Sequence, residues 1–213
     1  MRAGVVKNDH SFLCCRVPKV TEEYRVARRD EIADAALRAF RRKGFQATSM
    51  ADIISESGLS AGAIYGHFPS KSAIVVDVAT RIVGARIDTL VQLGRTEPLA
   101  PPPTVPRLLL RGMLDAIGSP GIMLQLWGEG MSDPDVHALA YDVIVQMRAA
   151  LTAYVSLWHQ QTHGLTADDA HVLAVEQVPL LVSAVQGYVV QAAIAPDFDG
   201  EAYLASVEKY LPR

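Results

Sequence analysis

Apolar residues recur at helical spacing along this chain, and no long stretch alternates between apolar and polar residues. Ile32, Ala36 and Phe40 follow one another at intervals of four, which places them on one face of a helix. A half-buried β-strand would need a period of two instead. The pattern therefore predicts an all-α protein.

Capping residues and helix breakers divide the chain into separate helices. Ser49 and Asp52 have the spacing of a capping box, and Gly58 can end the short helix that they begin. Ser60 and Ser70 can cap the two helices that follow. The expected helices are 23–43, a short helix from Ser49 to Gly58, a third from Ser60 to the residue before Pro69, and then 71–93, 105–117, 121–130, 134–163, 167–195 and 198–211. The proline-rich stretch 97–106 is expected to form a linker or bend.

Charge and cysteine content narrow the class of protein. Residues 1–80 contain 12 Lys and Arg against 9 Asp and Glu, whereas residues 81–213 contain 8 against 14. A mildly basic N-terminal part and an acidic C-terminal part suggest that the two parts have different partners. Cys14 and Cys15 are adjacent and cannot form a disulfide framework, so a cytoplasmic location is expected. Residues 1–20 lack the pattern of a signal peptide and are interpreted as a disordered arm.

One apolar run, residues 178–195, is long enough to suggest a membrane span. Polar or helix-disfavouring residues interrupt it, among them Pro179, Gln186 and Gln191. The preferred interpretation is a helix packed against other helices, and no membrane association is expected.

The segment Ser49–Phe68 has the length and the glycine turn of a helix-turn-helix. Ile64 and Phe68 are four residues apart and are expected to face inward, which leaves a smooth outer surface. Gly62 and Gly66 would each lower helix stability by about 1 kcal/mol relative to alanine, so their presence inside the helix needs a reason. We interpret these glycines as allowing close approach to the major groove of DNA. The alternative is that the small residues serve tight packing between helices.

The stretch RRDEIADAALRAFRRKGFQATSMADIISESGLSAGAIYGHFPSKSAIV, from Arg28 to Val75, resembles the DNA-binding domain of the TetR family of bacterial one-component repressors. The shared features are a first helix that ends in F-x-x-K-G-F, the opening T-S-M-A-D-I, the motif G-L-S-x-G-x-I-Y-x-H-F, and the S-K that starts the fourth helix. The resemblance implies a homodimer that binds a palindromic double-stranded DNA operator. It also implies that a small-molecule effector in the C-terminal domain releases the DNA.

The resemblance assigns DNA contacts to named residues of this chain. Thr48 and Ser49 would contact a phosphate at the start of the second helix, and Ala61, Gly62 and Ala63 would face base edges. Ser60, Tyr65, His67 and Lys71 would contact the DNA backbone. Ala61 and Gly66 depart from the family's commoner residues, which are longer or aromatic there, so few hydrogen bonds to bases are expected.

The resemblance also divides the chain into an arm (1–22), a DNA-binding domain (23–70) and a ligand-binding and dimerisation domain (71–213). The last two long helices would pair with their dimer mates, so a charge at Val182 or Val189 is expected to disrupt the dimer. The candidate ligand contacts are Met113, Met123, Trp127, Glu129, Met131, Gln146, Met147, Trp158 and Gln177, although each could equally be an ordinary core or surface residue.

The expected effector is a largely apolar molecule. If it is cationic, Glu129 would supply the carboxylate and Trp127 the ring for a cation–π contact.

Other functions find less support in the sequence. The chain has no glycine-rich phosphate loop, no CxxC motif and no nucleophile elbow, so catalytic residues and cofactors are not expected. His159 and His163 lie four residues apart near Asp168 and His171, which could bind a metal, but solvated helix-end residues are the preferred interpretation. Two alternatives stay open: a metal- or small-molecule-binding helical protein or enzyme without a DNA function, and a module that uses the helix-turn-helix for protein contacts.

Overall fold

The computed structural model describes residues 21–132 and 134–212. Within these ranges the chain forms helices and turns but no strand, which confirms the predicted all-α fold. The elements are α1 (Glu22–Lys43), α2 (Met50–Ser57), α3 (Ala61–Tyr65), α4 (Lys71–Leu93), the 3-10 helix η1 (Pro102–Thr104), α5 (Val105–Ile117), α6 (Pro120–Ser132), α7 (Pro134–His163), α8 (Ala167–Ile194) and α9 (Gly200–Tyr210). Residues 1–20 of the predicted arm lie outside the described residues.

Serine side chains begin α2, α3 and α4, as predicted. The Ser49 hydroxyl accepts the Asp52 N–H at 3.2 Å, and the Asp52 side chain accepts the Ser49 N–H in return. The Ser60 hydroxyl accepts the Ala63 N–H at 3.2 Å, and Ser70 caps α4 in the same way. These caps satisfy N–H groups that a helix start would otherwise leave without an acceptor.

Helix α3 is shorter than the predicted helix, which extended to the residue before Pro69. The N–H of His67 donates to the carbonyl of Ile64 at 2.9 Å, which closes the chain into a turn. Gly66 therefore lies at the C-terminal cap of α3 rather than in its interior. Only Gly62 carries the cost of a glycine inside this helix.

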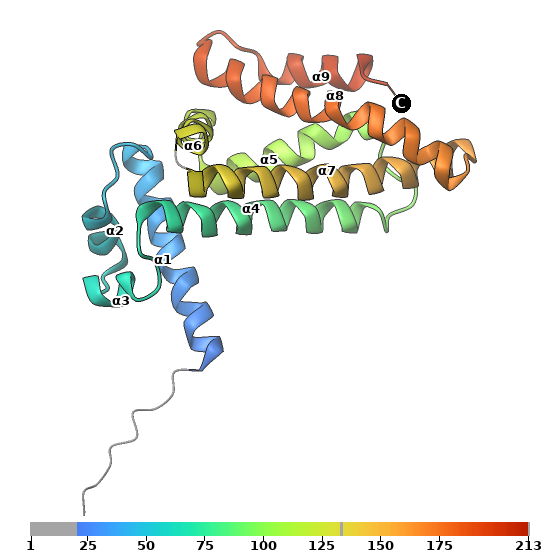
Figure 1. Cartoon of the computed structure of the whole chain (residues 1–213). Helices are drawn as coiled ribbons and strands as arrows, with labels where there is room; N and C mark the ends of the chain where they lie inside the picture. The colour runs from blue at the N-terminus through green and yellow to red at the C-terminus, as the bar shows by residue number, and fades with distance from the viewer. Residues whose placement is uncertain (1–20, 133, 213) are drawn as a thin grey trace, which may run out of the picture.

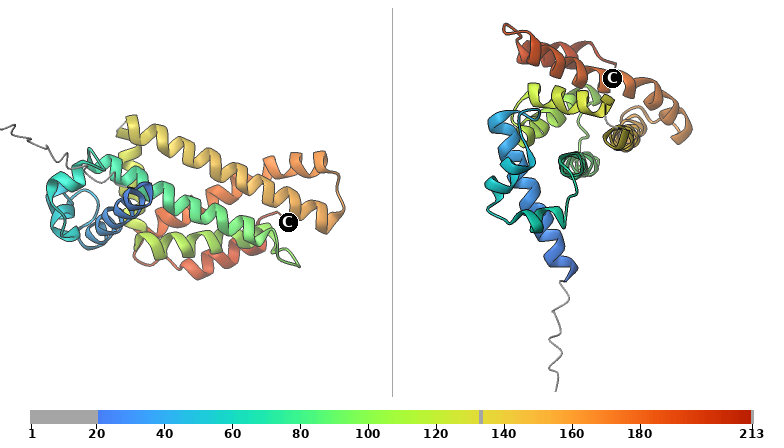
Figure 2. Two further views of the ribbon diagram at one scale, coloured as in Figure 1. Left: turned by 90° about the horizontal axis from the view of Figure 1, so that it is seen from below. Right: turned by 60° about the vertical axis from the view of Figure 1, so that its left-hand side comes forward.

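The N-terminal helices α1, α2 and α3 gather at one end of the long helix α4 (Figure 1). Helix α4 packs against α7, which in turn packs against α8, so three long helices form the frame of the larger part of the molecule. Helices α8 and α9 lie on the side of α7 that faces away from α4 (Figures 1 and 2). The arrangement exposes α2 and α3 at the far end of the molecule from the tip that joins α7 to α8.

The hydrophobic core of the N-terminal helices continues into the rest of the chain. Phe40 and Ile64 share one cluster of buried residues with Leu110 of α5 and Met123 of α6. A second cluster lies further along the bundle and includes Trp158 of α7. The first cluster therefore crosses the predicted boundary at residue 70 and joins side chains of α5 and α6 to those of the N-terminal helices. The division into domains at this position stays a prediction.

Two polar contacts reinforce this junction. The Gln125 side chain of α6 accepts the N–H groups of Phe45 and Gln46, at 2.8 and 3.4 Å, in the loop between α1 and α2. From the other direction, Arg41 of α1 donates to the carbonyl of Asp115 at the end of α5 at 2.6 Å. The loop before α2 is thus held in place by a side chain of α6.

Helix α8 is apolar on two opposite faces. It is the one described helix that is long and apolar enough to cross a membrane, which by itself is weak evidence for a span. One face, which includes Val178, Leu181 and Val189, is buried within the chain. The other face exposes apolar side chains. These are Val172, Val175, Leu180, Val190 and Ile194, and at 100° per residue they fall within an arc of about 140°.

The two faces of α8 correct one prediction about the dimer surface. Val182 and Val189 were expected to lie in a dimer face, but Val189 is 0% exposed and Val182 packs against the second core cluster. The exposed apolar face of α8 lies on the other side of the helix. It carries Leu180 and Val190, which are 46% and 40% exposed.

Candidate nucleic-acid interface and effector cavity

The outer face of α3 is smooth and unobstructed. Ala61, Gly62 and Ala63 are exposed, whereas Ile64 is buried in the core, as predicted. A Cβ atom placed on Gly62 would have no neighbour within 4 Å in the described part of the chain. Packing of this glycine against another helix of the same chain is therefore excluded. The smooth surface is available to an external partner.

An ion pair between α1 and α4 fixes the segment that follows α3. The Arg29 guanidinium lies 2.6 Å from the Asp77 carboxylate and also donates to the His67 carbonyl at 3.2 Å. It stacks over the Phe68 ring at 4.3 Å. These contacts hold the chain that follows α3, so the exposed face is presented by a rigid support.

The structure corrects the role expected for Thr48. This residue is 2% exposed, and its hydroxyl donates to the Gly44 carbonyl at 2.7 Å. A buried hydroxyl that is already bonded is not available to a phosphate. The phosphate contact at the start of α2 is therefore proposed for Ser49 alone, because Ser49 is exposed, although its hydroxyl also donates to the Asp52 carboxylate at 2.8 Å.

Lys71 also has partners within the chain. Its ammonium donates to the carbonyls of Phe45 and Thr48, at 3.1 and 3.0 Å, and lies 4.3 Å from the centre of the Phe45 ring. These bonds tie the start of α4 to the loop before α2. Tyr65, in contrast, is 51% exposed on α3. Lys71 is thus a positioning residue with one N–H left for a phosphate, and Tyr65 is the freer candidate for DNA contact.

These environments predict different results for two substitutions. Lys71→Ala is expected to lower the free energy of unfolding by about 1–2 kcal/mol, because it removes two hydrogen bonds from a charged donor. Tyr65→Phe is expected to leave stability unchanged within about 0.5 kcal/mol and to weaken DNA binding. Urea unfolding and DNA titration of both variants would measure this. A stable Lys71→Ala variant would show that its bonds to the loop contribute little.

A cavity of about 410 Å³ opens between α4, α5, α6, α7 and α8. Four predicted ligand residues line it: Met113, Trp127, Met131 and Met147. Its wall is mostly apolar, and His137 and Arg148 are the two lining residues that can carry positive charge. The sequence did not identify the other lining residues, which are Val83, Leu109, Gly130, His137, Ala140, Tyr141, Val143, Ile144, Arg148, Leu151, Val182, Val185 and Gln186. Tyr141, Ile144 and Arg148 recur at helical spacing on α7, but such spacing does not distinguish a cavity wall from a packed core.

The other predicted ligand residues lie outside the cavity. Met123 and Trp158 are buried in the two core clusters. Glu129 and Gln146 are not among the described lining residues, and the role of Glu129 as the carboxylate for a cationic effector stays a prediction. The side-chain oxygen of Gln177 accepts a hydrogen bond from Nε2 of the buried His159 at 3.0 Å, which gives Gln177 a partner within the chain.

His159 is buried at 2% exposure rather than solvated at a helix end, which corrects that part of the interpretation. Its ring is in contact with those of Trp158 and His163. Within residues 21–132 and 134–212 no group of three or more His, Cys, Asp or Glu residues is placed to hold a metal ion.

The exposed α3, its capped start and its rigid support define a helix-turn-helix of the DNA-binding type, joined here to a helical part that contains an apolar cavity. Residues 32–78 match the family model described as bacterial regulatory proteins, tetR family. The chain thus carries the N-terminal domain of the TetR family, which confirms the resemblance seen in the sequence.

A curated relative is named as a transcriptional regulator of the helix-turn-helix type. Over 71 residues the chain is 49% identical to the HTH-type transcriptional regulator YfiR of Bacillus subtilis strain 168, a match that covers 33% of each chain. The match therefore spans about a third of the length of this curated relative.

Solved structures share the whole fold at low sequence identity. A TetR transcription regulator from Haloarcula marismortui aligns with a TM-score of 0.66 and 18% identity, over 87% of this chain and 97% of the other. The regulator FadR from Bacillus subtilis, solved in complex with stearoyl-CoA, aligns with a TM-score of 0.61 and 15% identity, over 85% and 96%. At these identities the likeness shows the fold alone.

Proposed function

We propose that this protein is a ligand-responsive transcriptional regulator that binds a palindromic DNA operator as a homodimer. The observation that carries the proposal is the exposed face of α3, where Gly62 has no neighbour within 4 Å in the described chain, on a domain that matches the TetR family. A backbone bare of side chains can approach the floor of the major groove closely. The sense of regulation that the family resemblance supports is repression.

The direct test is DNA binding by the full chain. Fluorescence anisotropy with duplexes from the gene's own upstream region would locate an operator, and titrations at several salt concentrations would give the number of phosphate contacts. The logarithm of the association constant is expected to fall linearly with the logarithm of the salt concentration, because phosphate contacts release counterions. Binding that fails at low salt on every upstream duplex would contradict the proposal.

The exposed apolar face of α8 supports dimerisation by this helix. An exposed row of aliphatic side chains on an ordered helix is favourable only when another surface covers it. A second copy of the chain is the proposed partner, because a palindromic operator requires two helix-turn-helix units related by a twofold axis. α9 continues this surface with Tyr210, which is 73% exposed.

The cavity between α4 and α8 supports a neutral, largely apolar effector. Its volume of about 410 Å³ lies within the range of small-molecule sites. The described wall contains Arg148 and His137 but no carboxylate, so the cationic effector considered from the sequence has no charge partner there. Helix α6 connects this cavity to the DNA-binding part, because Trp127 lines the cavity and Gln125 holds the loop before α2.

The effector site predicts a fluorescence response. Neutral aromatic probes such as 1-naphthol are expected to change the emission of Trp127, and Val182→Phe is expected to weaken this binding at least about tenfold by filling the cavity. Trp127→Phe should remove the response, since Trp127 lines the cavity and Trp158, the other tryptophan of the sequence, is not among the described lining residues. A full response that persists in Trp127→Phe would place the probe elsewhere.

A further inference from the structure

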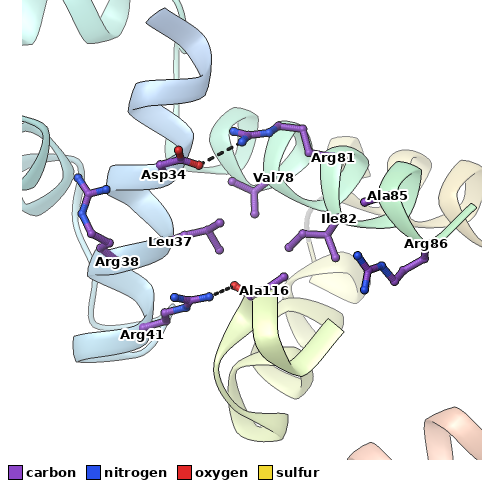
Figure 3. A pocket seen from close by; sticks show the side chains of 10 residues that line it. All are labelled: Asp34, Leu37, Arg38, Arg41, Val78, Arg81, Ile82, Ala85, Arg86 and Ala116. Atoms are coloured by element: carbon purple, nitrogen blue, oxygen red, sulfur yellow. Dashed lines mark hydrogen bonds and ion pairs between the residues drawn. The ribbon is translucent and has the colours of Figure 1, made fainter. Parts of the chain in front are cut away.

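A second cavity, of about 440 Å³, lies at the junction of α1, α4 and the end of α5 (Figure 3). Its floor is apolar and consists mainly of Leu37, Val78 and Ile82. Helix α4 separates it from the proposed effector cavity, because Ile82 lines one and its neighbour Val83 lines the other. The two cavities are therefore different sites.

Positively charged side chains surround this second cavity. Its lining residues include four arginines and a single carboxylate, Asp34. Two of the arginines have carboxylate partners: Arg81 lies 3.1 Å from Asp34, and Arg38 lies 3.0 Å from Glu56, which it shares with Arg42. The other two, Arg41 and Arg86, form no ion pair with a carboxylate in the described residues.

Arg41 and Arg86 extend from opposite sides toward Ala116 at the end of α5 (Figure 3). Arg41 bonds the backbone carbonyls of Asp115 and Ala116, which are neutral acceptors. Its positive charge is therefore left without a counter-charge in the described part of the cavity.

Arg86 is the more unusual of the two. Its Nε atom is buried and has no hydrogen-bond partner among the described residues. The guanidinium lies directly against α5 at Gly112, where a Cβ atom would come within 1.1 Å of Nη1. Gly112 thus makes room for the guanidinium, whose buried Nε has no acceptor among the described residues, and a buried donor in this state is unfavourable unless something else supplies an acceptor.

We propose that this cavity binds an amphiphilic organic anion, with an acidic group such as a phosphate against Arg41 and Arg86 and a small apolar body on Leu37, Val78 and Ile82. Guanidinium groups are well suited to phosphate and carboxylate groups, and the cavity volume suits a small molecule. The bound anion connects α1 of the DNA-binding part to α4 of the helical bundle. This site goes beyond the proposed effector cavity and does not depend on DNA binding.

Isothermal titration calorimetry of the full chain with 1-naphthyl phosphate tests the proposal. We expect saturable binding at one site per chain below about 1 mM, with much weaker binding of both 1-naphthol at this site and inorganic phosphate alone. Arg86→Met is expected to weaken binding at least about tenfold, because it removes the charged donor and keeps an apolar side chain of similar length. Thermal unfolding of each variant would confirm that it is folded.

Three further variants make the result decisive. Gly112→Ala keeps the Arg86 charge but displaces its guanidinium from α5, so it is expected to weaken binding as well. Arg95→Met removes an exposed charge from the chain after α4, and Val182→Phe fills the other cavity; neither should alter binding. Unchanged affinity in both Arg86→Met and Gly112→Ala would overturn the proposal. So would loss of binding in Val182→Phe, or inorganic phosphate binding as tightly as 1-naphthyl phosphate.

Discussion

Val190→Glu is expected to leave the protein monomeric and to weaken operator binding by about 10²–10⁴-fold. Val190 is 40% exposed on the outer apolar face of α8, so the folded chain tolerates a polar side chain there. In a dimer the same position would be covered, and two buried carboxylates would face a surface without counter-charges. A monomer reaches only one half-site, which removes the gain from binding both at once.

Multi-angle light scattering and operator titration would measure these two effects in parallel. Val91→Glu is the matched control, because Val91 is 47% exposed on α4 and lies outside the apolar face of α8. This variant should remain dimeric and bind the operator normally. A wild-type chain that is monomeric at micromolar concentration, or a dimeric Val190→Glu variant, would contradict the assignment of this face.

Substitutions at Gly62 are expected to change fold stability and operator affinity in opposite directions. Gly62→Ala should raise the free energy of unfolding by about 0.5–1 kcal/mol, because alanine is the better helix former and the structure leaves room for its methyl group. The same methyl group should hold α3 away from the groove floor and weaken operator binding. Gly62→Leu should weaken it more strongly, by at least about a hundredfold.

Thermal unfolding and operator titration of the two Gly62 variants would test this. Gly84→Ala supplies the matched control, because Gly84 lies inside α4 and a Cβ atom there also has no neighbour within 4 Å among the described residues. It should stabilise the fold by a similar amount and leave operator affinity unchanged. If Gly62→Ala binds the operator as tightly as the wild type, close approach is not the reason for this glycine.

The helices themselves could be predicted from local sequence. Ser49, Ser60 and Ser70 each form the cap that their positions predicted, and the predicted bounds of α4, α5 and α7 agree with the structure. Caps, glycine stops and prolines act through bonds to residues three or four positions away, so the sequence contains the information they need. The helix-turn-helix and the inward face of Ile64 follow from the same short-range rules.

Contacts between distant segments were decided only by the tertiary structure. The Lys71 ammonium donates to the carbonyls of a loop that lies more than twenty residues before it in the sequence. Helix α8 is apolar on both sides. Its sequence therefore did not show that the face with Val189 is buried and that the face with Val190 is exposed. In each case the side chain type was compatible with two environments, and the packing of another helix selected one.

The two cavities show most clearly that local sequence does not determine the contacts between distant segments. Met113 and Met123 are alike in sequence, yet Met113 lines a cavity and Met123 is buried in the core, because the packing of the surrounding helices leaves a cavity beside Met113 and encloses Met123. Arg86 and Gly112 are twenty-six positions apart and have no shared motif, and only the crossing of α4 and α5 brings them together. Local propensity determined where each helix starts and ends, whereas the distances between helices determined which side chains bind, support or merely pack.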